Sequence, residues 1–397
     1  MDHATSVVPT GPTRLCKRVA LFTGAYNHIA DGVSLTLNRL VEHLLRENIE
    51  VRIVAPSIRE PVLNHHGVVL VAPSVALPGR QEYRIGYRLS RFIIAELDRF
   101  GPSLVHIVTP DLLGYQALKW ARRRGLPIVS TYHTHFASYL KYYRLRMAEP
   151  IAWHYLRAFY RQCDELYVLS EVMRDELQRH GIDTVLRVWS LGVDMELFNP
   201  VRRASGWRQT FGLRPDLPVI SFVSRLVREK GVDVFATVVE ELRARGHRFH
   251  SVVVGEGPAR VALEARLPET TFTGHLTGTA LAEAFASSDI FLFPSETEAF
   301  GSVVIEAMAS QIPVVAADSP GSRHLVEHGV TGFLAPAGDI TAFSSCTERL
   351  LLKPQLRSQY GENGRKRAQR YRWDSVLSQI LRYYEQVLAT APAVKRR

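Results

Sequence analysis

Two glutamates flank an apolar run in the stretch SETEAFGSVVIEAMASQIPVV, residues 295–315. Glu298 and Glu306 stand at the two ends of AFGSVVI, a composition that otherwise suits a protein core. An unpaired carboxylate in a protein interior is very costly, so each side chain needs a polar partner or a ligand. A capping glutamate and an exposed helix glutamate account for either residue alone, but poorly for both. The pair therefore predicts a binding site.

A helix that begins near Gly301 would give this site further donors. The first backbone N–H groups of a helix have no partner within it and are free to meet a ligand. These groups belong to Phe300, Gly301, Ser302 and Val303. Glu306 then lies one to two turns further on, where its carboxylate can accept two ribose hydroxyls. Glu298 precedes the helix and can hold the hydroxyls of a second polar group such as a sugar.

Two cations follow another apolar run. Arg225 and Lys230 lie in SRLVREKG, directly after the strand-like PVISFVS at 218–224. Two positive charges held there would clamp a diphosphate and neutralise it as a leaving group without a metal ion. The sequence has no DxD spacing that would suggest a divalent ion between carboxylates. Two solvated loop charges are the plainer interpretation, but the place after a strand favours a functional one.

Two further positions lie after strand-like runs in the N-terminal half. Gly32, in HIADGVSLTL, would let a phosphate approach the N–H groups at the start of a helix, although an ordinary turn glycine explains it equally well. The surrounding sequence is not a GxGxxG fingerprint, which argues against a nicotinamide-dependent enzyme.

His133 ends the run PIVSTYH and can offer a ligand a donor or a backbone carbonyl. A structural histidine is the alternative, and His135 could serve instead.

Strands and helices alternate along the chain and must position these residues. In the N-terminal half, apolar runs predict strands at 18–24, 51–56, 104–108, 127–132 and 165–170, with an amphipathic helix from Val33 to Leu44. After a turn-rich stretch at 192–203, a second series predicts strands at 218–224, 250–255, 271–274, 290–295 and 312–317. Such alternation indicates parallel sheets covered by helices.

Two such series predict an α/β protein of two Rossmann-like, doubly wound domains that face a central cleft. We expect the first domain at 1–199 and the second at 200–375. A long helix at 373–388 has no strand after it, and we expect the chain from 376 to 397 to pack back on the first domain. Ligands of doubly wound sheets bind beyond the carboxyl ends of the strands, so residues just after strands carry most functional weight.

Composition excludes several classes of protein. At 397 residues the chain is too long for one ordinary core and suits two domains. The three cysteines lack CxxC spacing, which argues against a disulfide scaffold or a structural zinc site and fits a reducing cytoplasm. No apolar run is long enough to span a bilayer, and the N-terminus lacks the apolar core of a secretory signal. We therefore expect a cytoplasmic protein.

The formal net charge of +10 is compatible with nucleic acid, an anionic membrane or phosphorylated ligands. No zinc-finger or RNP-type motif accompanies the basic residues, so we expect no nucleic acid partner. The segment HFASYLKYYRLRM, residues 135–147, interleaves aromatic and basic side chains, as does an interfacial helix on anionic lipid. A helix packed inside the first domain is the open alternative.

These motifs together resemble glycosyltransferase family 4, a family of retaining enzymes with the two-domain GT-B fold, over nearly the whole chain. EAFGSVVIE is similar to the family's E-x7-E signature, SRLVREKG to its Arg–Lys diphosphate clamp, and VVVGEGP and FTGHLTG to its nucleotide-side loops. DGVSLTLNRLVEHL and VSTYHTHFASYLKYY resemble the branch that contains GDP-mannose-dependent α-mannosyltransferases and sulfoquinovosyltransferases.

The resemblance implies a role for each candidate residue. It gives Gly32 a backbone contact with the donor diphosphate and makes Arg225 and Lys230 the phosphate clamp. It puts His133 at the transferred sugar, so that His133, Arg225, Lys230 and Glu298 form the catalytic set. On the nucleotide side it implies ribose binding by Glu306, sugar contacts from Glu298 and the N–H groups of Phe300 and Gly301, and base contacts near Glu256, His275 and Leu276.

The implied reaction is transfer of a hexose, with GDP-mannose as the first candidate donor and a UDP-hexose next. The acceptor would be a hydroxyl of a lipid or glycan, the product an α-glycoside, and no metal or other cofactor would be essential. With no evident second carboxylate as nucleophile, the implied route is front-face attack by the acceptor hydroxyl, assisted by the leaving phosphate. The branch often has Asn-Gly or Gly-Gly where this chain has Asp31-Gly32, so Asp31 could alter acceptor choice.

The sequence is compatible with three other functions. A UDP-sugar-dependent glycolipid synthase, transferring glucosyl, glucuronosyl or sulfoquinovosyl groups, is the main alternative. A sugar-nucleotide 2-epimerase shares the architecture but explains the E-x7-E segment less well, and a non-catalytic nucleotide- or lipid-binding protein is hard to reconcile with the full residue set. A lipid acceptor would place the protein peripherally on the cytoplasmic face of a membrane.

Overall fold

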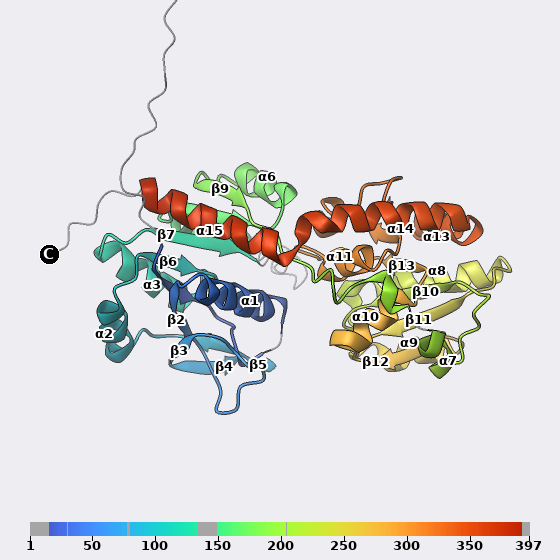
Figure 1. Cartoon of the computed structure of the whole chain (residues 1–397), viewed down its shortest axis with the longest axis horizontal. Coiled ribbons are helices and arrows are strands. Elements are labelled where there is room, and N and C mark those ends of the chain that lie inside the picture. The colour runs from blue at the N-terminus through green and yellow to red at the C-terminus, as the bar shows by residue number, and fades with distance from the viewer. Residues whose placement is uncertain (1–15, 30, 78–79, 134–148, 204, 391–397) are drawn as a thin grey trace, which may run out of the picture. The chain divides into compact units, whose positions relative to one another are not determined.

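The computed structural model describes residues 16–390, except residues 30, 78–79, 134–148 and 204. The described chain forms two compact units, each built around one parallel sheet (Figure 1). The first unit contains the chain up to Val168, the segment Leu177–Trp189 and the chain from Leu377 onward. The second contains Leu169–Glu176 and Ser190–Val376. Both units are α/β, as the alternating pattern predicted.

The sheet of the first unit has strand order β3-β2-β1-β6-β7-β8-β9, and all neighbouring strands in it are parallel. The strands are β1 (Arg18–Phe22), β2 (Glu50–Ala55), β3 (Val68–Val71), β6 (Leu104–Ile107), β7 (Ile128–Tyr132), β8 (Glu165–Val168) and β9 (Val185–Val188). A separate antiparallel pair consists of β4 (Ser74–Leu77) and β5 (Arg80–Gly86). The order reverses between β1 and β6, which marks the switch point where doubly wound sheets bind ligands.

Helices that connect these strands bury one apolar face each. In α1 this face consists mainly of Leu37, Leu40, Val41 and Leu44, as the sequence spacing predicted. The helices are α1 (Gly32–Arg46), α2 (Arg91–Phe100), α3 (Leu112–Arg123) and α5 (Glu149–Tyr160), while α6 (Glu171–Arg179) has residues in both units.

The last helix, α15 (Trp373–Thr390), packs on the first unit from Leu377 onward (Figure 1). The hydroxyl of Tyr384 is hydrogen-bonded to Nδ1 of His106, a fully buried residue of β6, at 2.7 Å. Tyr383 donates from its hydroxyl to the carbonyl of Val188 at the end of β9. The prediction that the final helix returns to the first domain is therefore confirmed.

The sheet of the second unit has strand order β12-β11-β10-β13-β14-β15 and is also fully parallel. The strands are β10 (Val219–Val223), β11 (His250–Val254), β12 (Thr271–Gly274), β13 (Ile290–Phe293), β14 (Val314–Ala317) and β15 (Gly332–Ala335). The helices are α7 (Ser205–Thr210), α8 (Val232–Ala244), α9 (Arg260–Arg266), α10 (Gly278–Ala286), α11 (Ser302–Ala309), α12 (Pro320–Arg323), α13 (Ile340–Leu352) and α14 (Pro354–Ala368). Short 3-10 turns cover Pro200–Arg202, Arg228–Lys230 and Gln369–Tyr371.

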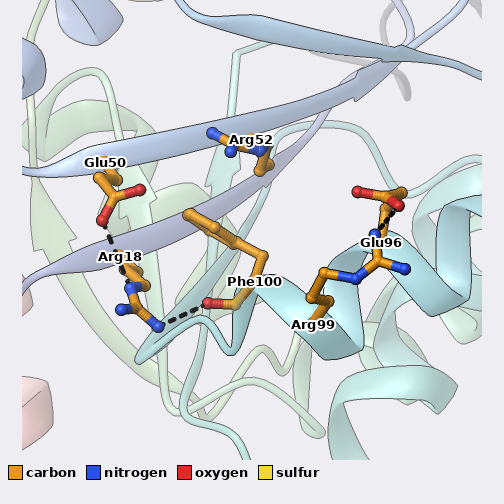
Figure 2. A pocket seen from close by; sticks show the side chains of 6 residues that line it. All are labelled: Arg18, Glu50, Arg52, Glu96, Arg99 and Phe100. Carbon is orange, nitrogen blue, oxygen red and sulfur yellow. Dashed lines mark hydrogen bonds and ion pairs between the residues drawn. The ribbon is translucent and has the colours of Figure 1, made fainter.

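A charged pocket of about 230 Å³ lies at the amino ends of β1 and β2, the edge of the first sheet opposite the predicted ligand edge (Figure 2). Arg18 lies 3.5 Å from the carboxylate of Glu50 and donates to the carbonyl of Phe100. Arg99 is paired with Glu96, and the Arg52 guanidinium lies 4.7 Å from the centre of the Phe100 ring. Most of these charges already have protein partners, so the pocket does not compete with the opposite edge as a candidate site.

Candidate functional site

A tight turn places Lys230 at the carboxyl edge of the second sheet. The loop after β10 closes in the 3-10 turn that ends at Lys230, and Gly231 follows with a positive φ of 75°. A Cβ on Gly231 would lie 2.6 Å from the backbone oxygen of Pro294, in the loop after β13. Glycine is therefore required at 231, because only it combines this backbone conformation with so close an approach.

The structure pairs Lys230 with Glu298. The ammonium group forms an ion pair with Oε1 of Glu298, which also accepts a hydrogen bond of 3.1 Å from the Ser295 hydroxyl. Both charged side chains are largely covered, at 15% and 17% exposed. The sequence assigned the two residues to different ligand groups, phosphate and sugar, and did not anticipate their contact. In this structure each residue is the other's counter-ion.

Arg225 supplies the second cation near this edge. It follows β10 closely, its side chain is exposed, and it has no ion-pair partner among the residues that the structure describes. The adjoining backbone is fixed, since Leu226 donates to the carbonyl of Glu256 at 2.8 Å. A Cβ on Gly255 would lie only 1.9 Å from the carbonyl oxygen of Ser224, so the two loops cross in close contact. A guanidinium without a counter-ion on a fixed loop is suited to bind an anion.

Helix α11 begins at Ser302 with Gly301 as its N-cap, which confirms the predicted start. Gly301 has φ 89°, and no side chain caps the helix. Among the described residues, the N–H groups of Ser302 and Val303 have no hydrogen-bond acceptor. Phe300 is buried and fixes the entry to the helix, its ring 4.8 Å from that of His324. The helix start therefore offers free donors beside Glu298.

Glu306 lies in the second turn of α11, is partly covered, and has no hydrogen-bond or ion-pair partner within the described chain. Burial raises the pKa of its carboxyl group to about 8. This carboxyl group lacks hydrogen-bond donors around it, and hydroxyl groups of a ligand would supply them.

Three residues proposed near a nucleotide base lie in the loops after β11 and β12. The exposed carboxylate of Glu256 is paired with Arg260 in the next helix, so it is not free for a base. His275 is exposed and Leu276 is half-buried, both directly after β12. Glu256 lies close to Gly274, since a Cβ there would be 3.1 Å from its Oε1. The two loops are therefore neighbours, and they are joined by a hydrogen bond of 2.8 Å from the N–H of Gly255 to the carbonyl of Gly274.

In the first unit, His133 follows β7 directly and is buried. Its ring packs edge-on against the indole of Trp189, with ring centres 5.8 Å apart, and its Nε2 has no hydrogen-bond partner in the described chain. Burial lowers the pKa of His133 to about 4, so the ring is neutral at physiological pH. His133 is thus a neutral imidazole with one nitrogen unsatisfied, at the edge where the sequence placed it.

Gly32 is the first residue of α1, and a Cβ built there meets no atom within 4 Å. The Asp31 carboxylate caps the helix by accepting from the N–H of Ser34 at 2.8 Å. Asp31 therefore has a structural role in this chain, and it takes up one of the helix donors that a phosphate would otherwise use. His135 and the segment 135–147 lie outside the described residues.

Some residues around these groups carry no signal in the sequence. Trp189 supports His133 but lies at the end of β9, far along the chain, and Ser295 orients Glu298 from within a strand-like run. A hydroxyl three residues before Glu298 is a weak hint, whereas nothing marks Trp189. In the part of the chain that the structure describes, no cluster of three His, Cys, Asp or Glu side chains is arranged to hold a metal ion. No described helix is long and apolar enough to cross a membrane.

Comparison with known proteins identifies the relatives of this chain. Residues 30–197 match the model for Glycosyltransferase Family 4, and residues 205–367 match that for Glycosyl transferases group 1. A GDP-mannose-dependent alpha-mannosyltransferase of Mycolicibacterium smegmatis is 35% identical, over 94% of this chain and 98% of that protein. A sulfoquinovosyl transferase of Arabidopsis thaliana is 30% identical, over 92% of this chain and 72% of that protein.

A solved structure shows the same fold. Sucrose-phosphate synthase from Thermosynechococcus elongatus superimposes with a TM-score of 0.77 at 22% identity, covering 94% of this chain and 99% of that one. The match spans both units, which supports the GT-B architecture of two doubly wound domains. With its two-sheet fold, its paired Lys230 and Glu298 and these relatives, the chain belongs to glycosyltransferase family 4 and is a glycosyltransferase that uses nucleotide sugars.

Proposed function

We propose that this enzyme transfers mannose from GDP-mannose to a hydroxyl group of a lipid or glycan, with retention and without an essential metal ion. The observation that carries the proposal is the relative of 35% identity, a GDP-mannose-dependent alpha-mannosyltransferase, which aligns over nearly the full length of both chains. The cations Arg225 and Lys230 after β10, which have the charge that a nucleoside diphosphate needs, support it.

In this proposal the donor binds to the second unit. Arg225 and Lys230 bind the diphosphate, Glu306 accepts the ribose hydroxyls, and Glu298 faces the sugar together with the free N–H groups at the start of α11. The unpartnered Arg225 and Glu306 support these roles, because each lacks a counter-group that a ligand would supply. The loops of Glu256 and His275 take the base through their backbone.

In the first unit, the proposal assigns His133 and Gly32 to the donor. His133 contacts the transferred sugar through its unsatisfied nitrogen, and the open backbone at Gly32 approaches the phosphates. In the reaction the acceptor oxygen attacks the anomeric carbon on the face that the leaving phosphate vacates. The bond from carbon to phosphate oxygen breaks, and the hydroxyl proton passes to that phosphate oxygen. The cations stabilise the charge that develops on the leaving group.

Calorimetric titration with GDP, UDP and ADP in parallel tests the donor. The proposal expects the tightest binding for GDP, followed by transfer of radiolabelled mannose from GDP-mannose to lipid or glycan acceptors. Determination of the anomeric configuration by NMR checks retention, and activity in the presence of EDTA checks metal independence. Binding of none of the three nucleotides would refute the proposed donor class. A trapped glycosyl-enzyme adduct would contradict the front-face route.

A UDP-sugar-dependent glycolipid synthase is the second candidate. The relative of 30% identity, a sulfoquinovosyl transferase that aligns over 92% of this chain, favours it. A preference for UDP in the same titration would select this candidate and direct the next assays to glucosyl, glucuronosyl and sulfoquinovosyl transfer. Turnover of the donor without an acceptor would instead point to an epimerase. If the acceptor is a lipid, the enzyme should lie peripherally on the cytoplasmic face of a membrane. It should then float with anionic liposomes in a density gradient.

A further inference from the structure

His28 is a buried histidine that none of the roles above uses. It lies in the loop between β1 and α1, four residues before Gly32, and is only 3% exposed. Its neighbour across the sheet is Pro56, which directly follows β2. His28 therefore lies at the carboxyl edge of the first sheet, where doubly wound domains bind ligands.

The contact with Pro56 fixes the protonation of the ring. Nδ1 of His28 lies 3.0 Å from the backbone oxygen of Pro56. A carbonyl oxygen can only accept, so Nδ1 carries the proton and donates it. Burial is the main reason that the pKa of His28 lies below its ordinary value, so the ring is neutral. Nε2 consequently has a lone pair and no proton.

No donor in the described chain meets this lone pair. Nε2 of His28 is buried without a hydrogen-bond partner, and so is the hydroxyl oxygen of Ser34, in the first turn of α1. Leaving a buried acceptor unsatisfied costs about 1–3 kcal/mol, which is why native structures seldom do so without a ligand or water at the site. Two such atoms flank Gly32 in sequence, where a Cβ would find open space.

The charged groups nearest to His28 are already engaged. Asp31 and Arg84 both influence the ring. The Asp31 carboxylate accepts from the N–H of Ser34, and Arg84 donates to the hydroxyl and backbone oxygens of Ser74. A phosphate oxygen would meet a lone pair at Nε2 and be repelled. The site therefore suits a neutral group that donates a hydrogen bond.

We propose that Nε2 of His28 accepts a hydrogen bond from a hydroxyl group of the acceptor substrate, and that the start of α1 is a subsite for a polyol. This inference rests on the proposed function for the existence of an acceptor. It adds a residue that recognises the acceptor and changes none of the roles proposed above for the donor.

Two substitutions separate the two ring nitrogens. His28→Asn keeps a donor close to the position of Nδ1, for the Pro56 carbonyl, and removes Nε2. His28→Gln places an amide oxygen close to the position of Nε2. A matched control is His43→Asn, because His43 also has a buried, unpartnered Nε2 but lies in the last turn of α1. Thermal unfolding of all three variants checks that they fold.

Steady-state kinetics use the nucleotide hexose that the wild type turns over. The acceptor probes are methyl α-D-mannopyranoside in solution and dioleoylglycerol in dioleoylphosphatidylglycerol vesicles. We expect the acceptor KM to rise about tenfold in His28→Asn, the equivalent of about 1.4 kcal/mol. His28→Gln should recover part of this loss, and the donor KM should stay unchanged. A wild-type acceptor KM in His28→Asn, or an equal effect of His43→Asn, overturns the proposal.

Imidazole ¹⁵N NMR gives a readout without turnover. With His28→Asn to assign the signal, Nε2 of His28 should resonate as an unprotonated nitrogen and shift when methyl α-D-mannopyranoside or glycerol is added. A signal that shows Nε2 protonated, or that neither polyol moves, contradicts the proposal. If the wild type binds no nucleotide but this shift occurs, the proposed function fails and the polyol subsite stands.

Discussion

The two units differ in the charge of the groups that follow their strands. The second unit presents Lys230 paired with Glu298, an unpartnered Arg225, and Glu306. The first presents neutral imidazoles, His133 and His28, each with a buried nitrogen that lacks a partner in the described chain. Burial keeps the pKa of both rings below the ordinary value.

This difference matches the chemistry of the two halves of a glycosyl transfer. A nucleoside diphosphate carries several negative charges and needs cations and free N–H groups. Sugar and acceptor hydroxyls are neutral, and a charged side chain without a partner would have to be desolvated to bind them. Both units are built around a parallel sheet, so we expect the specialisation to lie in the few residues placed after the strands.

Removal of the positive charge of Lys230 should have the largest effect on catalysis. Lys230→Ala should lower kcat/KM by about 100- to 1000-fold, because the substitution removes a fixed positive charge that stabilises the leaving diphosphate. Nucleotide affinity in calorimetry should fall as well. Arg228→Ala is the matched control, since Arg228 is an exposed cation of the same 3-10 turn. Near-normal turnover in Lys230→Ala, or an equal loss in both variants, would show that charge at 230 is not what the second unit contributes.

Removing the counter-ion should separate binding from turnover. In Glu298→Gln the carboxylate no longer neutralises Lys230, so the affinity for the free nucleoside diphosphate should increase about tenfold, or about 1.4 kcal/mol. Transfer should slow, because a sugar contact is lost. Calorimetry with the diphosphate and initial rates with the nucleotide sugar measure the two effects. The exposed Glu296 offers the control Glu296→Gln, and weaker diphosphate binding in Glu298→Gln would contradict the assignment of the ion pair.

Much of the architecture was predictable because the central strands are buried and apolar. The predicted runs at 18–24 and 104–108 contain β1 and β6, and the predicted helix start near Gly301 is the N-cap of α11. Of the edge strands, β12 was predicted at 271–274, whereas β3, β9 and β15 were missed. The sequence of β3 is VVLV, a continuous apolar run, although Val68 is 50% exposed at the edge of the sheet, so this strand could have been predicted from its sequence.

The contacts within the site were less predictable than its residues. Lys230 and Glu298 are 68 positions apart, and each follows a different strand, so only the sheet order brings them together. The state of His28 depends on the carbonyl of Pro56, which has no side-chain signature in the sequence. Asp31 was suspected of a role toward substrate, yet its position as the N-cap of α1 explains it locally.

A smaller expected effect is the release of a proton from Glu306 when the donor binds. Burial raises the pKa of Glu306 from 4.5 to about 8, and ribose hydroxyls would favour its ionised form. Donor binding near pH 7 should therefore release a proton. Calorimetry in buffers of different ionisation enthalpy measures this release, which should be absent in Glu306→Gln. Equal proton release by wild type and variant would exclude Glu306 as the ribose ligand.

The same carboxyl group should affect stability. The folded chain retains this proton at pH values where the unfolded chain has lost it. The free energy of unfolding should therefore fall as the pH rises from about 5 to about 8, by an amount on the order of 1–3 kcal/mol. Denaturant titrations of wild type and Glu306→Gln across this range check the sign. A variant with the same pH dependence as the wild type would mean that the carboxyl group titrates normally.

The last prediction concerns the residues that support His133. Tyr384 of α15 is hydrogen-bonded to Nδ1 of His106, whose Nε2 is bonded to the hydroxyl of Thr131, two residues before His133. Tyr384→Phe leaves a buried imidazole nitrogen without its partner, which should reduce the free energy of unfolding by about 1–3 kcal/mol. Tyr383→Phe, which loses a half-buried bond to a carbonyl at 3.1 Å, should cost less. If the neutral residues serve sugar and acceptor, Tyr384→Phe should lower kcat while diphosphate affinity stays at the wild-type value. A change in diphosphate affinity would instead show that the two units do not divide the substrates by charge.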